Sequence, residues 1–125
     1  MTFFSVVITN YNHEKFIMKS IKSVLNQSFK NFELIIIDNY SSDNSKKIIR
    51  SFKDKRIKFF QIKNKGIIAK SRNYGIKKAK SDWIAFLDSD DYWFKNKLEI
   101  FFNTIKRNNN FQVFSNNETM RFESK

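Results

Sequence analysis

A short apolar run that ends in carboxylates carries the clearest chemistry in this sequence. Residues 83–91 read Trp-Ile-Ala-Phe-Leu-Asp-Ser-Asp-Asp. An apolar run of this length with aromatic and branched side chains is typical of a buried strand. Asp88 and Asp90 are therefore expected at the rim of a sheet, where open α/β folds bind their ligands. Two carboxylates one residue apart can share Mg²⁺ or Mn²⁺, which bridge protein carboxylates to substrate phosphates. The segment thus indicates the handling of a nucleoside diphosphate.

The same aspartates also have a purely structural explanation. Aspartate is favoured in turns and at helix N-caps, and Asp91 in particular fits a turn or a cap before the next helix. The strand-like run directly before the cluster, in a chain that alternates strands and helices, favours the functional interpretation of Asp88 and Asp90.

The elements that would position these carboxylates follow from the hydrophobic spacing. Apolar runs predict strands, and apolar residues at intervals of three and four predict helices. Strands are predicted at residues 3–8, 32–37, 57–62, 83–87 and 111–114, and helices at 13–27, 42–53, 68–80 and 94–105. Ser41, Ser42 or Asp43 can cap the second helix. Alternation of helices with near-continuous apolar strands predicts an α/β, Rossmann-like, doubly wound and mostly parallel sheet covered on both faces.

Polar residues gather at the carboxyl ends of three predicted strands, and these ends share one edge of a parallel sheet. They are Thr9, Tyr11 and Asn12 after the first strand, Asp38 and Asn39 after the second, and Asp88, Ser89 and Asp90 after the fourth. Tyr11 offers an aromatic face for a base, and Arg72 offers a guanidinium for the carboxylates or the ligand. Together they outline a nucleotide-sugar site. His13, the sole histidine, is interpreted as a surface residue at a helix start and receives no role.

Composition limits the other classes of function. The 125 residues, 41% of them hydrophobic, fit one domain with a real core. The absence of cysteine excludes a disulfide framework and a thiolate site, and favours a reducing cytoplasm. No apolar run reaches the roughly 20 residues of a membrane span, and no signal peptide is inferred.

The net charge of +12 comes mostly from scattered lysines. Because they form no dense basic run, the sequence predicts no specific nucleic-acid partner, although nucleic-acid binding stays open as a third interpretation. Modest peripheral attraction to the anionic inner face of a membrane is the expected consequence of the charge.

Seven segments, in order, resemble the nucleotide-sugar glycosyltransferases with the GT-A fold, specifically glycosyltransferase family 2. They are Val-Val-Ile-Thr-Asn-Tyr-Asn (6–12), Ser-Val-Leu-Asn-Gln-Ser-Phe (23–29), Phe-Glu-Leu-Ile-Ile-Ile-Asp (32–38), Ser-Ser-Asp-Asn-Ser (41–45), Ala-Lys-Ser-Arg-Asn-Tyr-Gly-Ile (69–76), Trp-Ile-Ala-Phe-Leu-Asp-Ser-Asp-Asp (83–91) and Lys-Leu-Glu (97–99). One such segment would be weak evidence for the family, but the shared order of all seven across nearly the whole chain makes the resemblance specific.

The resemblance implies a nucleotide side of the site. Thr9 and Tyr11 would border the nucleobase, with Tyr11 stacked on it, and Asp38 and Asn39 would accept hydrogen bonds from the base or ribose. Where the family commonly has two aspartates and a glycine, this chain has Asp38, Asn39 and Tyr40. Asn39 keeps an acceptor oxygen but has no charge, so altered base recognition is expected.

The resemblance also implies a diphosphate side. Arg72 would orient the nucleotide, Asp88 would lean towards the ribose or sugar beside Ser89, and Asp90 would bind the Mg²⁺ or Mn²⁺ that neutralises the leaving diphosphate. Residues 1–115 are then the nucleotide-sugar-binding part of a truncated GT-A domain. Residues 116–125 are a tail that begins a missing acceptor-binding half, which would hold the general base.

The predicted function is that of an inverting glycosyltransferase of cell-surface polysaccharide synthesis. It would transfer sugar from a UDP-linked donor to a saccharide or lipid-linked acceptor by direct displacement, in the cytoplasm or at the inner face of the membrane. Two alternatives stay open. One is a remnant that binds donor without turnover. The other is a nucleotidyltransferase, for which the glycine-rich phosphate loop is lacking.

Overall fold

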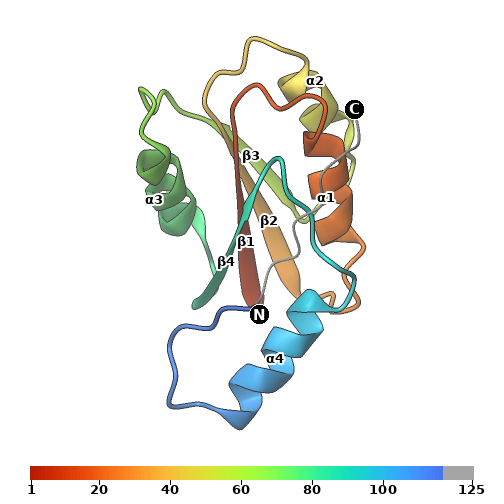
Figure 1. Ribbon diagram of the computed structural model, residues 1–125, viewed down its shortest axis with the longest axis vertical. Helices are drawn as coiled ribbons and strands as arrows, with labels where there is room; N and C mark the ends of the chain where they lie inside the picture. Colours follow the sequence, from red (N-terminus) through yellow and green to blue (C-terminus); the bar gives the residue numbers. More distant parts are fainter. Residues whose placement is uncertain (117–125) are drawn as a thin grey trace.

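Helices cover both faces of a parallel sheet in the computed structural model, which describes residues 1–116 (Figure 1). The strands are β1 (Phe4–Asn10), β2 (Phe32–Asp38), β3 (Ile57–Gln61) and β4 (Trp83–Asp88), and the helices are α1 (Ile17–Leu25), α2 (Ser45–Ser51), α3 (Ile68–Lys78) and α4 (Lys97–Arg107). The order of strands in the sheet is β3-β2-β1-β4, and all three neighbouring pairs are parallel. The predicted doubly wound α/β fold is confirmed.

Alternation along the two central strands divides the core between the two faces of the sheet. On one face the strands pack against α1, α2 and α4, with Val6, Ile8, Leu34, Ile36, Ile17, Ile21, Ile49 and Leu98 at the centre of the cluster. On the other face Val7, Ile35 and Ile37 pack beneath Tyr74 of α3. A Cβ atom on Gly75 would lie 2.5 Å from Val7 Cγ1, so this glycine allows α3 to approach β1 closely. Figure 1 shows α3 alone on its side of the sheet.

Three helices begin later than the apolar spacing predicts. Helix α1 begins at Ile17 instead of residue 13, α2 at Ser45 instead of residue 42, and α4 at Lys97 instead of residue 94. Asp43 Oδ1 accepts a hydrogen bond of 2.9 Å from Ser45 N, so one of the three candidate residues does serve the first amide of α2. The residues before α1 and α2 form loops of the candidate site, described below.

The strand predicted at residues 111–114 is wrong. The segment has no strand geometry, and the side chains of Phe111 and Val113 are 61% and 84% exposed. The Phe114 ring packs on Trp83, with ring centroids 5.5 Å apart. Apolar residues favour a strand only where a neighbouring strand and a covered face are present, and this segment has neither among the described residues. Of the predicted tail, residues 117–125 lie outside the described part.

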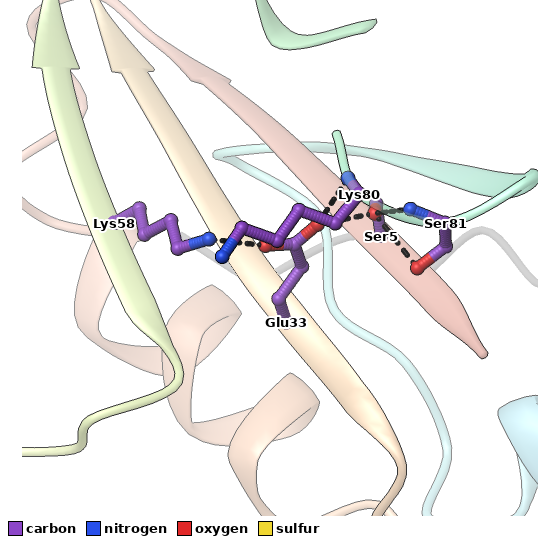
Figure 2. A network of polar contacts seen from close by, with 5 residues as sticks. All are labelled: Ser5, Glu33, Lys58, Lys80 and Ser81. Carbon is purple, nitrogen blue, oxygen red and sulfur yellow. Dashed lines mark hydrogen bonds and ion pairs between the residues drawn. The ribbon is translucent and has the colours of Figure 1, made fainter. Parts of the chain in front are cut away.

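A buried polar network joins the amino-terminal ends of the strands (Figure 2). Glu33 of β2 is 5% exposed. Its Oε1 accepts hydrogen bonds from Ser5 Oγ at 2.6 Å and Lys80 N at 2.7 Å, and its Oε2 lies 2.6 Å from Lys58 Nζ. Ser81 N donates to Ser5 Oγ at 3.2 Å. The network therefore fixes the segment that enters β4 against β1 and β2.

The hydrogen bonds of this network determine the pKa of Glu33. Burial raises that pKa, but the hydrogen bonds from Lys58, Ser5 and Lys80 outweigh burial and hold it below the ordinary value of 4.5. Glu33 in turn raises the pKa of Lys58, chiefly by accepting its hydrogen bond.

Glu33→Gln is expected to lower the free energy of unfolding by about 2 kcal/mol at pH 7, because buried hydrogen bonds to charged groups are worth roughly 1.5–3 kcal/mol. The carboxylate stabilises the fold fully above its unfolded pKa of 4.5, and this stabilisation is lost as the pH falls through the lower folded pKa. Urea denaturation should therefore show a smaller difference in stability between the two proteins at pH 3 than at pH 7. Glu99→Gln, at an exposed carboxylate, is the control. An equal difference at both pH values would contradict the assignment.

Candidate functional site

The carboxyl ends of the four strands lie at one edge of the sheet, as predicted. Asn10 pairs in register with Asp38, Asp38 with Gln61, and Thr9 with Asp88. In the order β3-β2-β1-β4 the direction of winding reverses between β1 and β4, and doubly wound folds bind ligands outside the sheet at that reversal. Thr9 and Asp88 stand on either side of it.

Asp38 is fully buried at the end of β2. Its Oδ1 accepts hydrogen bonds from Asn10 Nδ2 at 2.8 Å and Ser41 Oγ at 2.5 Å, and its Oδ2 accepts from Ser41 N at 2.9 Å and Gln61 Nε2 at 3.1 Å. These four bonds use the acceptor positions of a carboxylate. Asp38 thus organises the loop after β2, and its direct contact with base or ribose stays a prediction.

The loop after β1 and the loop after β2 are hydrogen-bonded to each other. Asn12, at a φ of 51°, accepts a bond of 2.8 Å from Ser42 N through Oδ1. Asp43 Oδ2 accepts a bond of 2.9 Å from Glu14 N. These bonds fix the backbone beside Tyr11, whose side chain is exposed. An exposed ring on a fixed loop is suited to stacking on a planar ligand.

Asn39 connects the same edge to the loop before α3. Its Oδ1 accepts a hydrogen bond of 2.9 Å from Asn64 N, and Asn64 Nδ2 donates to Ser71 Oγ at 2.9 Å. A backbone N–H can only donate, so this bond fixes the orientation of the Asn39 amide. Tyr40 follows with a φ of 48°, a value uncommon outside glycine and asparagine. The role of Asn39 towards a base or ribose stays a prediction.

The acidic residues after β4 form a turn. Asp91 N donates to Asp88 O at 3.0 Å and closes the turn, so Asp91 is a turn residue and not the cap of α4, whose N-cap is Asn96. Arg72 Nη2 lies 3.0 Å from Asp88 Oδ1, and both side chains are exposed by nearly half. Asp90 is also exposed. The turn therefore presents the carboxylates of Asp88 and Asp90 to solvent, beside the guanidinium that Arg72 of α3 contributes.

Asp88 and Asp90 fit a hard divalent cation by their chemistry. Within residues 1–116 no group of three or more His, Asp or Glu side chains could hold a metal ion. Mg²⁺ in phosphate-handling sites is commonly held by one or two carboxylates, with the substrate phosphates and water completing its shell. Two exposed carboxylates match that kind of site, in which the cation arrives with the diphosphate.

His13 contacts the acidic turn, which the sequence did not reveal. It does stand just before α1, because its carbonyl accepts a bond of 2.9 Å from Ile17 N. Its side chain is half-buried, however, and Nδ1 lies 2.7 Å from Ser89 Oγ. The two residues are 76 positions apart, and nothing in the local pattern links them.

Gln27 is a second residue with an unexpected position. It is fully buried after α1, where its Nε2 donates to Phe94 O at 2.7 Å and its Oε1 accepts from Leu98 N at 3.0 Å. Ser23 Oγ also accepts a bond of 3.1 Å from Trp93 N. The chain that leaves the acidic turn is thus attached to α1. In the sequence, this attachment is indicated only by a polar residue, Gln27, that follows the apolar face of the predicted helix.

The sequence is similar to those of known glycosyltransferases. The sequence profile described as Glycosyl transferase family 2 matches residues 5–120. An uncharacterized glycosyltransferase of Rickettsia bellii is 44% identical over 95% of the chain and 17% of its own length. The Escherichia coli protein named UDP-Glc:alpha-D-GlcNAc-diphosphoundecaprenol beta-1,3-glucosyltransferase WfgD is 40% identical over 90% of the chain and 47% of its own length.

A solved structure shares the fold. The crystal structure of S. aureus TarS 1-349 in complex with UDP superposes with a TM-score of 0.82 at 32% identity, over 86% of this chain and 33% of that one. The chain therefore spans less than half the length of the relatives described here.

Proposed function

The chain belongs to glycosyltransferase family 2, and on that premise we propose that it binds a UDP-linked sugar at the carboxyl edge of its sheet, for transfer of the sugar to a saccharide or lipid-linked acceptor. The observation that carries the proposal is that the carboxyl ends of β1 and β4 lie side by side at the reversal of winding, with Tyr11 in the loop after β1, Asp90 in the turn after β4, and Asp88 paired with Arg72. The name of the E. coli relative, with UDP-Glc and a diphosphoundecaprenol acceptor, and the UDP complex of TarS support this choice of donor and acceptor.

On the nucleotide side, Tyr11 provides the stacking surface and Thr9 borders the base. Asp38 and Asn39 lie at the end of the adjacent strand, where their hydrogen bonds to the loops hold this surface in place. Stacking on an aromatic ring is worth roughly 1–3 kcal/mol per base, whatever the base. Discrimination between uracil and other bases therefore rests on the polar residues around Tyr11.

On the diphosphate side, Asp88 and Asp90 would hold Mg²⁺ or Mn²⁺, which neutralises the charge of the leaving diphosphate. Arg72 orients Asp88 through their ion pair and adds a positive charge at the same place. The acceptor hydroxyl must lose its proton to a base within about 2.6–3.2 Å. We assign no residue to that role, and Glu118 and Glu123 of the predicted tail lie outside the described residues.

Titration calorimetry of the chain with UDP is the test of this proposal. Binding is expected with Mn²⁺ or Mg²⁺ and not with EDTA, because two carboxylates without a cation repel a diphosphate. GDP is the control for the base and should bind more weakly. Binding of equal affinity in EDTA would contradict the cation assignment, and no binding of any nucleotide would contradict the proposal.

Product analysis with labelled UDP-glucose separates three functions of the same site. Sugar on the acceptor indicates a glycosyltransferase, nucleotide on the acceptor indicates a nucleotidyltransferase, and donor binding without any product indicates a binding module.

We also expect modest attraction to anionic membranes, near lipid-linked acceptors. The net charge of +12 supports it. In residues 1–116 the longest helices have 11 residues, and none is long and apolar enough to cross a bilayer. Exposed charges are screened beyond about 8 Å at physiological salt, so sedimentation with anionic liposomes should decrease as salt is raised. Sedimentation that is independent of salt would contradict the expectation.

A further inference from the structure

The middle residue of the acidic turn is the buried one. Asp88 and Asp90 are exposed, whereas Ser89 between them is only 1% exposed. Its hydroxyl oxygen lies 2.7 Å from His13 Nδ1. Ser89 therefore points away from the solvent into which its two neighbours project, and its one described side-chain partner comes from the loop after β1.

Besides the pairing of β4 with β1 and the bonds of the following segment to α1, three described contacts involve the turn itself, and they differ in strength. The Arg72–Asp88 ion pair is largely exposed, and such pairs contribute roughly 0–1 kcal/mol. The bond from Asp91 N to Asp88 O closes the turn but attaches it to nothing else. The bond between His13 and Ser89 is partly buried and joins the turn to another loop. A hydrogen bond in such surroundings constrains position more strongly than an exposed one.

The imidazole is itself held in place. The His13 carbonyl accepts bonds of 3.0 Å from Phe16 N and 2.9 Å from Ile17 N, at the start of α1. Its ring meets the Phe16 ring edge to face, with centroids 6.1 Å apart. A ring fixed by its backbone and by an aromatic neighbour can in turn fix Ser89.

We propose that His13 is a positioning residue of the donor site, which couples the loop that carries Tyr11 to the turn that presents Asp88 and Asp90. This inference rests on the proposed function, because it assigns the base to the first loop and the diphosphate to the turn. His13 acts through Ser89 and touches neither the cation nor the phosphates. Its contribution needs no charge, since a neutral imidazole can donate or accept this hydrogen bond according to its tautomer.

Four variants separate the hydrogen bond from the shape of the side chain. His13→Phe keeps a ring beside Phe16 and removes both nitrogens. His13→Asn places an amide oxygen or nitrogen one bond beyond Cγ, as Nδ1 is in histidine, and the amide can donate or accept a hydrogen bond. Ser89→Ala removes the partner hydroxyl. Lys15→Gln, at an exposed residue of the same loop, is the control.

The first measurement needs no ligand. Amide hydrogen exchange of Asp91, whose N–H closes the turn, is expected to accelerate roughly fivefold in His13→Phe and Ser89→Ala, the equivalent of losing one hydrogen bond of about 1 kcal/mol. His13→Asn should restore slow exchange, and Lys15→Gln should leave it unchanged. Unchanged exchange in both His13→Phe and Ser89→Ala would overturn the proposal, because the bond between His13 and Ser89 would then not stabilise the turn.

The second measurement uses UDP with Mn²⁺ and, separately, uridine. His13→Phe and Ser89→Ala should each weaken UDP–Mn²⁺ binding roughly fivefold, and the double variant should be no weaker than either. Uridine binding should be unchanged, which a general loss of structure would not allow. Full affinity for UDP–Mn²⁺ in His13→Phe, or fully additive effects, would overturn the proposal. If the wild-type chain binds no UDP, the proposed function fails, and the exchange measurement alone decides whether His13 positions the turn.

Discussion

Asp90→Ala is expected to weaken the binding of UDP in the presence of Mn²⁺ by on the order of 10- to 100-fold, which is the effect that even indirect ligand partners have on metal affinity. Asp90 is exposed at the end of the acidic turn and, with Asp88, forms the donor set assigned to the cation. Asp88 keeps part of its charge engaged with Arg72. Asp90 therefore has the greater share of the attraction to a cation that arrives with a diphosphate.

Asp82→Ala is the matched control for this measurement. Asp82 is an exposed aspartate that directly precedes β4, whereas Asp90 follows it, so both variants lose one carboxylate next to the same strand. Calorimetry should find the Asp82 variant equal to the wild type. In EDTA, the wild type and the Asp90 variant should bind UDP equally weakly. A full-strength complex of Asp90→Ala with UDP and Mn²⁺ would remove Asp90 from the cation site.

Asp38→Ala is expected to lower the free energy of unfolding by about 3–5 kcal/mol, because several hydrogen-bond donors lose one buried acceptor and each unsatisfied donor costs roughly 1–3 kcal/mol. The substitution would leave donors of Asn10, Ser41 and Gln61 without their acceptor at the end of β2. Domains are stable by only about 5–15 kcal/mol in total, so the variant should unfold at a much lower concentration of urea. Asp82→Ala again serves as the control.

Asp38→Asn distinguishes the two roles of this residue. An amide replaces one acceptor oxygen by a donor, which would face the N–H groups of Ser41 or Gln61, so Asp38→Asn should reduce stability. Because the amide keeps the other acceptor oxygen, the reduction should be smaller than with alanine. If Asp38 also contacts the base, the folded variant will bind UDP less tightly than the wild type. Equal affinity with reduced stability would restrict Asp38 to the organisation of the loops. Stability equal to the wild type would contradict the role derived from its four hydrogen bonds.

The arrangement of strands and helices could be predicted from the sequence because it depends on local periodicity. The run 32–37 is apolar except for Glu33 and forms most of the buried strand β2. The run 111–114 is apolar except for Gln112, yet Val113 is exposed. A short apolar run indicates that a strand is possible, whereas a partner strand and a covering layer determine whether the strand forms.

The gathering of the candidate site residues at one edge of the sheet could also be predicted, because parallel strands bring their carboxyl ends together. The hydrogen-bond partners of individual side chains could not be predicted. His13 meets Ser89 across 76 positions and Gln27 reaches Leu98 across 71. Such pairs depend on how loops pack, and hydrophobic spacing carries no information about that. The aspartate at position 38 shows the same limit, since its chemistry suits a ligand but its surroundings already satisfy it.

The network of Glu33, Ser5, Lys80 and Ser81 anchors the beginning of β4, and the alignment of β4 on β1 places Asp88 at the edge of the sheet. Within β4, only Leu87 is buried, so the hydrophobic effect distinguishes weakly between alternative alignments of this strand on β1. A slip of one residue would shift the strand by about 3.3 Å and turn every side chain to the opposite face. Asp88 would then leave the edge and Leu87 would lose its place in the core. The anchor at the beginning of β4 thus fixes the register of this strand on β1. Substitutions in the anchor should therefore misplace the carboxylates at the other end of the strand, although they do not contact them.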